Sequence, residues 1–324
     1  MPLGKWSTTN DVIAEASPIE LSRLTNSTVI VTGSNTGIGA TTAAALLKIG
    51  AHVIYACRNI SKAEAAAKTA TTQQVNGTYT CLKLDLSSLQ SIRDFVAEYN
   101  TQSISKSFKP LSCLVLNAGL VSNSSQHKTQ EGLEITFGVN HIGHYYLTNL
   151  LLPELRKNAP SRVVVVSSDS HYKGLILRTP QELSNVDLLE QKVAYGFDEK
   201  MMRKYGSSKL ANVLFSQHLH EKEKGNGIVS ASLHPGSMIS TDIAARNGWI
   251  QTFVAKYLLG MFTKNPDQGA ATTLYVCLLP QNELEGQYFD NSSTKNSSAL
   301  TLDEPGAKNA RLALETLSQK LSKL

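Results

Sequence analysis

The sequence contains little cysteine, and its cysteines form no recognisable site. Four cysteines are spread over 324 residues, with no CxxC pair and no histidine at the spacing of a shared metal ligand. This pattern argues against a zinc site and against a disulfide framework. We therefore expect no bound metal, and reduced, mostly buried thiols at Cys57, Cys81, Cys113 and Cys277.

Long apolar runs are lacking as well. No stretch approaches the roughly 18 consecutive apolar residues of a membrane span, and Met1–Glu20 lacks the apolar centre of a secretory signal. These absences favour a soluble, cytoplasmic protein. A peripheral contact with a membrane surface stays open, because it needs no such span.

The basic residues form no cluster. Lysine and arginine exceed aspartate and glutamate by 31 to 26, which gives a net charge of +5 and a pI near 8.9. Basic and acidic residues alternate, as in Glu221-Lys222-Glu223-Lys224, and no aromatic stacking motif accompanies them. We therefore expect no nucleic-acid partner.

What the sequence does contain is a regular alternation of short apolar runs, rich in β-branched residues, with segments of helical periodicity. This alternation predicts an α/β fold with a single Rossmann-type, doubly wound parallel sheet of about seven strands and helices on both faces. The expected strands are Thr28–Thr32, His52–Cys57, Tyr79–Leu84, Leu111–Leu116, Arg162–Ser167 and Ile228–His234. The expected helices are Ile38–Ile49, Ser61–Gln74, Ser88–Asn100, Leu133–Leu155 and Ser207–Lys222.

The same rhythm predicts one domain at residues 27–290, preceded by an N-terminal extension at 1–26. Two segments interrupt it, and we expect a substrate loop at 169–203 and a lid at 243–262. Residues 291–324 predict a polar loop and a C-terminal helix packed on the same domain, because apolar residues recur there at helical spacing.

A glycine-rich turn follows the first expected strand and leads into an alanine-rich helix. Glycines allow a tight turn and a close approach of the backbone to a pyrophosphate, whose charge is favoured at a helix N-terminus. The alternative is a tight turn that binds no ligand. The candidate cofactor-binding residues here are Gly33, Ser34, Asn35, Thr36, Gly37, Ile38 and Gly39.

Arg58 follows the second expected strand, where a Rossmann fold usually presents an acid to the adenosine ribose. A guanidinium pairs with the 2′-phosphate of NADP, so the sequence favours NADP(H) over NAD, unless Arg58 is simply a solvated surface residue. Asn59 is a second candidate for this phosphate. Asp85 and Leu86, after the third strand, are candidates for the adenine, and the alternative role of Asp85 is to cap the next helix.

Tyr205 and Lys209 stand four residues apart, which places them on one face of an expected helix. A tyrosine with a pKa near 10 is a poor base at neutral pH, and lowering that pKa to about 7 takes roughly 4 kcal/mol of phenolate stabilisation. The Lys209 ammonium, together with a positively charged nicotinamide, can supply it. Taken alone, this spacing also fits two exposed residues on a helix.

With these features, and with Asn117-Ala118-Gly119 after the fourth strand and Ser167-Ser168 after the fifth, the chain resembles the short-chain dehydrogenase/reductase family. The resemblance covers residues 27 to about 290. It implies that Asn117, Ala118 and Gly119 stabilise the central sheet and line the adenine-ribose side of a cofactor site.

The resemblance also implies a catalytic tetrad. By position in the motifs, Ser168 polarises a substrate carbonyl, Tyr205 transfers a proton, Lys209 binds the nicotinamide ribose and Asn140 completes the set.

Finer motifs are similar to the retinol dehydrogenase-like branch of the family, and then to the reductase domains that occur together with WW modules. The motifs of the first kind are Ala56–Asn59, Val139–His144, Ser207–Asn212 and His234–Gly236, and those of the second are Val166–His171, Phe262–Lys264 and Gly269–Thr273. The paired tryptophans of a WW module have no counterpart, since only Trp6 and Trp249 occur. We therefore do not expect the proline-motif partners of such modules.

The chain departs from the family pattern beyond Pro235-Gly236. Family members often carry a threonine five residues after this proline, in contact with the nicotinamide carboxamide, whereas this chain has Ser240 there and Thr241 beside it. Either hydroxyl is a candidate for the cofactor.

Two histidines, His141 and His144, follow Asn140 closely. We expect them to pack or cap near the core rather than bind a metal, because no third ligand is evident.

The segment Trp249–Phe262 is apolar and aromatic, and it stands where family members carry a lid. This suggests a lipophilic substrate such as a retinoid, a steroid or a long-chain aldehyde. The alternatives are a buried core helix and a contact at a membrane interface.

The expected function is the NADP(H)-dependent interconversion of such a carbonyl and its alcohol. The alternative is a catalytically weak NADP-binding regulator or scaffold, because a fold alone does not settle function. Family members often pair through two long helices, which correspond to Leu133–Leu155 and Ser207–Lys222, so the resemblance also implies a homodimer.

Overall fold

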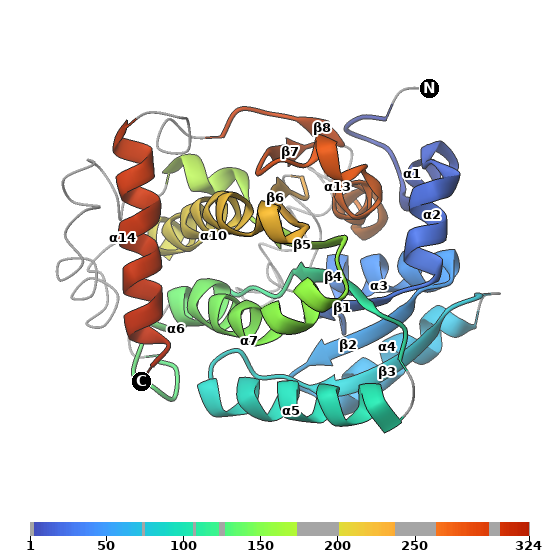
Figure 1. Ribbon diagram of the computed structural model, residues 1–324, viewed down its shortest axis with the longest axis horizontal. Helices are drawn as coiled ribbons and strands as arrows, with labels where there is room; N and C mark the ends of the chain where they lie inside the picture. The colour runs from blue at the N-terminus through green and yellow to red at the C-terminus, as the bar shows by residue number, and fades with distance from the viewer. Residues whose placement is uncertain are drawn as a thin grey trace, which may run out of the picture.

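The computed structural model describes residues 3–72, 75–105, 108–122, 127–173, 201–236, 264–297 and 305–323 (Figure 1). Most of the expected substrate loop, all of the expected lid, and Ser240 and Thr241 lie outside the described residues.

A single, mostly parallel sheet forms the centre of the protein, as the alternation of strands and helices predicts. The strand order is β3-β2-β1-β4-β5-β6-β7-β8, and only β8 runs antiparallel to its neighbour. The strands are β1 (Thr28–Thr32), β2 (His52–Cys57), β3 (Thr78–Lys83), β4 (Leu111–Leu116), β5 (Ser161–Val166), β6 (Ile228–His234), β7 (Tyr288–Asp290) and β8 (Ser293–Thr294). The fold class is confirmed, and the short edge strand β8 brings the sheet to eight strands.

Helices cover both faces of this sheet and give it two apolar layers. One layer joins the sheet to α3 (Gly37–Ile49), α4 (Ile60–Thr71) and α13 (Pro266–Leu278). The other joins it to α5 (Leu89–Ser105), α7 (Gly143–Lys157) and α10 (Met201–Glu223). Because the strands are covered on both sides, all residues of β1, β2, β4, β5 and β6 are buried.

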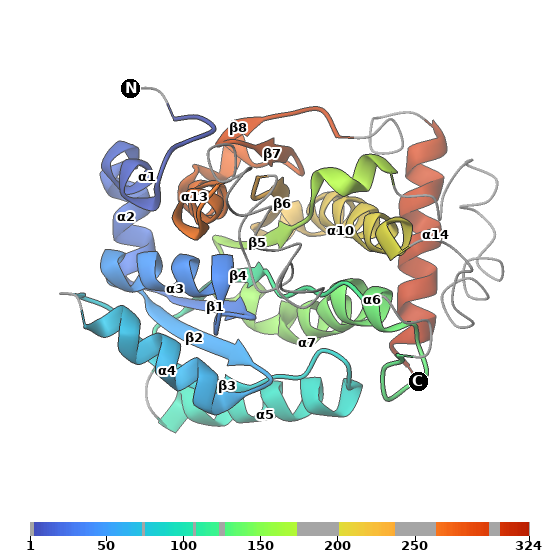
Figure 2. The ribbon, with the colours of Figure 1, turned by 180° about the vertical axis from the view of Figure 1, so that it is seen from behind.

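The N-terminal extension contains two helices, α1 (Thr9–Glu15) and α2 (Pro18–Thr25), which lie beside α3 and α13 (Figure 2). Glu20 of α2 reaches Arg162 of β5, with 3.1 Å between the guanidinium nitrogen and the carboxylate oxygen. Arg162 is 1% exposed and also donates to the carbonyl oxygens of Val276 and Leu279 in the α13 region. The extension therefore supplies the counter-charge of an arginine inside the core.

The prediction of a single helix at Leu133–Leu155 is wrong in one respect. The structure divides it into α6 (Ile135–Phe137), a π-helical turn η1 (Gly138–Ile142) and α7. A π turn inserts one residue into the helix, and apolar periodicity does not reveal such an insertion. A Cβ at Gly143 would collide with the Leu86 carbonyl oxygen, so the start of α7 lies close to the loop after β3.

The C-terminal helix α14 (Pro305–Leu321) crosses α10 and brings a row of buried leucines against it (Figure 1). Leu314, Leu317 and Leu321 pack with Leu210 and Leu214 of α10. α14 therefore covers part of α10, one of the two long helices through which pairing is expected, and the homodimer stays a prediction. Short 3-10 turns complete the described chain at η2 (Asp169–Lys173), η3 (Lys224–Asn226) and η4 (Gln281–Glu283). Within the described ranges, every helix is too short or too polar to cross a bilayer.

Candidate active site

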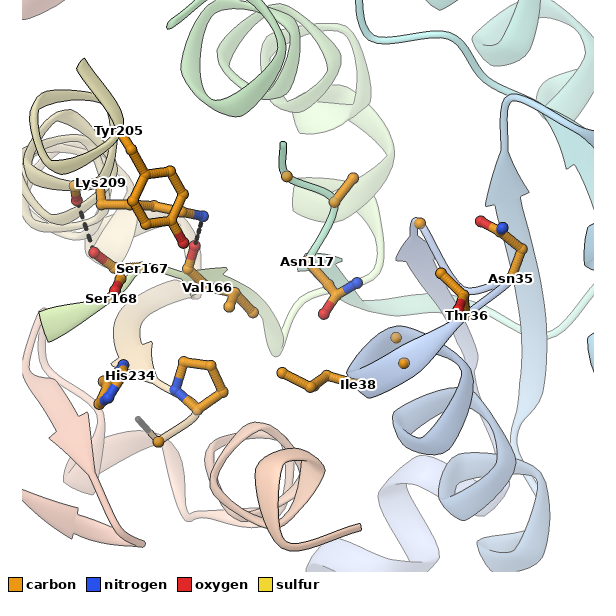
Figure 3. Close-up of a pocket in the computed structure, with 17 residues that line it drawn as sticks. Asn35, Thr36, Ile38, Asn117, Val166, Ser167, Ser168, Tyr205, Lys209 and His234 are labelled. Carbon is orange, nitrogen blue, oxygen red and sulfur yellow. Dashed lines mark hydrogen bonds between the residues drawn. The ribbon is translucent and has the colours of Figure 1, made fainter. Parts of the chain in front are cut away.

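A cavity of about 340 Å³ opens at the carboxyl ends of the parallel strands, beside the point where the order turns from β1 to β4 (Figure 3). Open α/β sheets bind ligands at such a switch point. The lining comes from the turns after β1 and β4, the ends of β5 and β6, and α10.

The glycine turn forms one wall of this cavity. Gly33, Asn35, Thr36, Gly37, Ile38 and Gly39 line it. Gly33 and Gly37 have φ of +67° and +56°, a region that favours glycine. A Cβ at Gly39 would collide with the Gly33 carbonyl oxygen and the Asn117 amide, so only glycine leaves this approach open.

Ser34 belongs to the turn but faces away from the cavity. Its hydroxyl donates to the carbonyl oxygen of Val31 at 3.0 Å and lies 3.4 Å from the Cys57 sulfur, and Ser34 is fully buried. The Ser34 side chain is therefore not available to a ligand in the cavity.

The candidates for the adenosine end lie outside the cavity lining. Arg58 is exposed after β2, and Asn59 caps α4 by accepting from the backbone N–H of Lys62 at 2.9 Å. Asp85 accepts from the backbone and hydroxyl of Ser87, at 2.9 and 2.6 Å, rather than from the first turn of α5. Leu86 is buried beside Gly143.

The turn after β4 forms the adjoining wall, with Asn117, Ala118 and Gly119. The backbone N–H groups of Asn117 and Ala118 donate to the Thr32 hydroxyl at 2.9 and 3.0 Å, and the Asn117 side chain donates to the Thr32 carbonyl oxygen at 2.9 Å. These bonds join the ends of β1 and β4, so both walls are held by the same residue.

Ser168, Tyr205 and Lys209 line the same cavity (Figure 3). Lys209 is 2% exposed, and its ammonium donates to the carbonyl oxygen of Val166 at 2.9 Å. The Ser167 hydroxyl donates to the Lys209 carbonyl oxygen at 2.7 Å, which ties the end of β5 to α10.

Burial shifts the pKa values of both titratable groups. It raises the pKa of Tyr205 to about 12, with a smaller opposing effect from the Ser168 hydroxyl and a smaller reinforcing effect from the Asp169 carboxylate. Burial lowers the pKa of Lys209 to about 8. At neutral pH the phenol therefore carries its proton and can donate it, whereas accepting a proton requires the phenolate, which forms at higher pH.

Ser168 stands next to the carboxylate of Asp169. Its hydroxyl donates to Asp169 Oδ1 at 3.1 Å, and the backbone N–H of Asp169 donates to His234 Nδ1 at 3.2 Å. His234 is the last residue of β6 and forms part of the cavity wall, so the ends of β5 and β6 are joined beside Ser168.

Asn140 lies behind the cavity, in η1, and is fully buried. Its side chain accepts from the Leu120 N–H at 2.8 Å and donates to the Leu120 carbonyl oxygen and the Ser208 hydroxyl, both at 3.0 Å. A Cβ placed on Gly119 would lie 3.4 Å from Lys209 Nζ and 3.5 Å from Asn140 Oδ1. Asn140 and Lys209 thus face the same side of the turn after β4.

Comparison with known proteins agrees with this geometry. The model of the short chain dehydrogenase family matches residues 27–180. WW domain-containing oxidoreductase of Gallus gallus is 39% identical over 299 residues, which are 92% of this chain and 68% of that protein. Retinol dehydrogenase 11 of Homo sapiens is 36% identical over 287 residues, which are 88% of this chain and 84% of that protein. The chain belongs to the short-chain dehydrogenase/reductase family.

Membership makes the chain an NAD(P)-dependent oxidoreductase of the CH–OH/C=O class. It spans between 62% and 69% of the length of the WW domain-containing oxidoreductases that it matches.

Solved structures share the architecture of this family member. An uncharacterized protein from Mycobacterium paratuberculosis superimposes with a TM-score of 0.67 at 28% identity, over 98% of both chains. L-sorbose reductase from Gluconobacter frateurii, solved with NADPH and L-sorbose, gives a TM-score of 0.60 at 18% identity, over 82% of this chain and 94% of that chain, and shares the fold.

The residues present in this oxidoreductase fit a nicotinamide dinucleotide. The glycine wall leaves room at a helix N-terminus for a pyrophosphate, which the N–H groups and dipole there favour. Pro235, Gly236, Tyr205 and Lys209 also line this cavity.

Sequence reasoning missed three residues of the lining, namely Val166, Ser167 and His234. They stand at the carboxyl ends of β5 and β6. The strand pattern was itself the signal, because in a parallel sheet these ends meet at the ligand site.

The two histidines after Asn140 make buried hydrogen bonds. His141 lies 2.9 Å from the Ser318 hydroxyl of α14 and 3.4 Å from the Asn212 amide oxygen. Across the described part of the chain, no group of three or more histidine, cysteine or acidic side chains could hold a metal ion.

Proposed function

We propose that this chain is an NADP(H)-dependent oxidoreductase that interconverts a lipophilic carbonyl and its alcohol, with Tyr205 as proton donor and acceptor. The observation that carries the proposal is that Ser168, Tyr205 and Lys209 share one cavity with the glycine turn. A hydride donor in that cavity and a proton donor beside it are the two requirements of carbonyl reduction.

The choice of NADP(H) rests on Arg58. It is an exposed arginine directly after β2, and the backbone N–H of Gly33 donates to the carbonyl oxygen of Ala56 at 2.9 Å, so the end of β2 adjoins the glycine turn. A guanidinium at this edge favours a 2′-phosphate, and it stands where NAD-dependent enzymes typically carry a carboxylate.

When bound, NADPH supplies the hydride. Ser168 and Tyr205 donate hydrogen bonds to the carbonyl oxygen and stabilise the charge that develops on it, an effect of several kcal/mol in preorganised sites. For this, the Ser168 hydroxyl turns from Asp169 Oδ1 toward the substrate. Tyr205 then gives its proton to the oxygen.

Lys209 and Asn140 keep this arrangement in place. The Lys209 ammonium is anchored to the Val166 carbonyl and lies beside the phenol ring, where it stabilises a phenolate after proton transfer. Asn140 holds both the Leu120 backbone and the Ser208 hydroxyl, and the Ser208 hydroxyl in turn donates to the Tyr205 carbonyl oxygen at 2.8 Å. Asn140 therefore links the catalytic helix α10 to the chain that follows the cavity-lining turn Asn117–Gly119.

The lipophilic substrate class is supported by relatives. Retinol dehydrogenase 13 of Mus musculus is named for an alcohol of this class. The apolar segment Trp249–Phe262 agrees with it by composition.

The test measures oxidation of NADPH and of NADH by the purified chain with all-trans-retinal, a steroid ketone and a long-chain aldehyde. We expect turnover with NADPH in preference to NADH on at least one of them. Tight NADPH binding with no turnover on all three would instead favour an NADP-binding regulator.

A further inference from the structure

His144 is a buried titratable group that the mechanism above does not use. It is the second residue of α7, 1% exposed, and both of its ring nitrogens have partners. Nδ1 lies 3.1 Å from the Asn140 carbonyl oxygen, and Nε2 lies 2.9 Å from the Thr32 hydroxyl.

These partners determine which nitrogen carries the proton. A carbonyl oxygen only accepts, so Nδ1 must donate to Asn140. The Thr32 hydroxyl already accepts from the N–H groups of Asn117 and Ala118, so its remaining capacity is its own proton. Two acceptors lie within reach of this proton: His144 Nε2 at 2.9 Å and the Val115 carbonyl oxygen at 3.3 Å from the Thr32 hydroxyl. Thr32 donates to Nε2, the closer of the two.

The charge around His144 keeps the ring neutral. Burial lowers the pKa of His144 to about 3, the Asn140 carbonyl partly opposes this, and the Lys209 ammonium and His141 lower it further. Burial also lowers the pKa of His141 to about 4, so neither ring is charged at neutral pH. A neutral ring is what the two hydrogen bonds require, because an imidazolium could not accept from Thr32.

The two ends of this connection are the two halves of the site. Thr32 holds the cavity-lining turn of Asn117 and Ala118, while Asn140 holds Leu120 and also Ser208, which belongs to the catalytic helix α10. A chain of hydrogen bonds thus runs from the Asn117–Ala118 turn through Thr32 and the His144 imidazole to the Asn140 carbonyl oxygen.

We propose that His144 is a positioning residue, which as the neutral Nδ1–H tautomer fixes the Asn140 carbonyl relative to the Asn117–Ala118 turn. The proposal rests on the proposed function for its catalytic consequence, since it is Tyr205 and Lys209 that the fixed unit supports.

The first experiment reads the tautomer directly, by 15N NMR of the full-length protein labelled on its histidine rings. We expect His144 to show the neutral Nδ1–H pattern, without titration between pH 5.5 and 9, assigned by loss of its signals in His144→Gln. An Nε2–H pattern, or protonation near pH 6.5, would overturn the proposal. This spectrum needs no turnover, so it decides the hydrogen-bond assignment even if the wild type reduces no carbonyl, a result that would contradict the proposed function instead.

The second experiment compares His144→Leu, His144→Gln and the control His52→Leu. We expect His144→Leu to lower kcat by about 10- to 100-fold, because small displacements of a reacting group have effects of this order. The Kd of NADPH and the KM of the carbonyl should change by no more than about threefold.

The two other variants separate positioning from folding. The glutamine amide offers an NH2 group that can donate and a carbonyl oxygen that can accept, so His144→Gln should recover most of the lost kcat. His52 is a buried histidine of β2, remote from the cavity lining and bonded to the Thr78 hydroxyl at 2.7 Å, and His52→Leu should lower Tm without lowering kcat. Equal loss of kcat in His144→Gln and His144→Leu, or in the control, would contradict a positioning role.

Discussion

The Lys209 ammonium lies 5.6 Å from the centroid of the Tyr205 ring and donates to the Val166 carbonyl oxygen at 2.9 Å. It is thus a buried charge held by one backbone oxygen, at the place where the proposed reaction moves a proton. Burial disfavours this charge, and the lowered pKa of Lys209, about 8 against 10.5, expresses that cost.

This cost makes the stability of the protein depend on pH. Lys209→Met removes the titrating group and therefore this dependence. Between pH 8 and 10 the unfolded chain binds more protons at Lys209 than the folded chain does, so folding becomes more favourable as pH rises. We expect the free energy of unfolding of the wild type, measured by urea denaturation, to rise relative to Lys209→Met by on the order of 3 kcal/mol when the change is complete. A constant difference between the two proteins from pH 7 to 10 would show that burial does not perturb Lys209.

Asp169 provides a second pH test. Its carboxylate contributes to the raised pKa of Tyr205, so Asp169→Asn should lower that pKa. Alcohol oxidation needs the phenolate, and its rate therefore increases as pH rises toward the Tyr205 pKa. We expect the rise of kcat/KM for oxidation to begin at lower pH in Asp169→Asn than in the wild type. The same onset in both proteins, or a later onset in the variant, would remove Asp169 from the electrostatics of the site.

Arg58→Ala tests the cofactor preference. If Arg58 pairs with a 2′-phosphate, the variant loses hydrogen bonds of a charged pair, about 1.5–3 kcal/mol, which weakens NADPH binding by roughly 10- to 100-fold. NADH, which has no such phosphate, should bind equally well to both proteins. Lys68→Ala, which removes another exposed cation, of α4, is the matched control and should leave both affinities unchanged. Equal weakening of NADPH and NADH would contradict the assignment.

Glu20 tests the role of the N-terminal helices. Its carboxylate is the partner of Arg162, which is 1% exposed, so Glu20→Ala leaves a positive charge unpaired in the core. Removing one partner of a buried ion pair typically costs about 3–5 kcal/mol, and we expect a loss of unfolding free energy of this size. Glu15→Ala, at an exposed position of α1, should change it by less than about 0.5 kcal/mol. If both variants are equally stable, the extension does not serve the core through Glu20.

The sheet could be predicted from the sequence because its signals are local. β1, β2, β4 and β6 have the bounds expected from their β-branched runs. A sheet of about seven strands was expected, but β7 and β8 were not located, since strands of three and two residues carry too little pattern to read. The helices of the extension had readable signals, including a capping box at Thr8 and Asp11, but nothing local indicates that Glu20 reaches Arg162.

The candidate site, too, could be predicted from the sequence only in part. The motifs identified residues that the fold brings into one cavity, including Gly33, Ser168, Tyr205 and Lys209. Motif position does not say where a side chain points, so it did not distinguish Ser34, which faces the core, from its neighbours. Nor did it separate the second histidine after Asn140, which joins two walls of the site, from the first, which contacts α14.

The most direct test of this account is a single-turnover measurement of NADPH oxidation in the wild type and in Tyr205→Phe, with saturating NADPH and the best carbonyl from the panel. Loss of the positioned proton donor should slow the chemical step by about 10²- to 10⁴-fold. The Kd of NADPH should stay within about twofold, since the ring itself remains in the wall. Oxidation at the wild-type rate in Tyr205→Phe would contradict the central claim that this phenol delivers the proton.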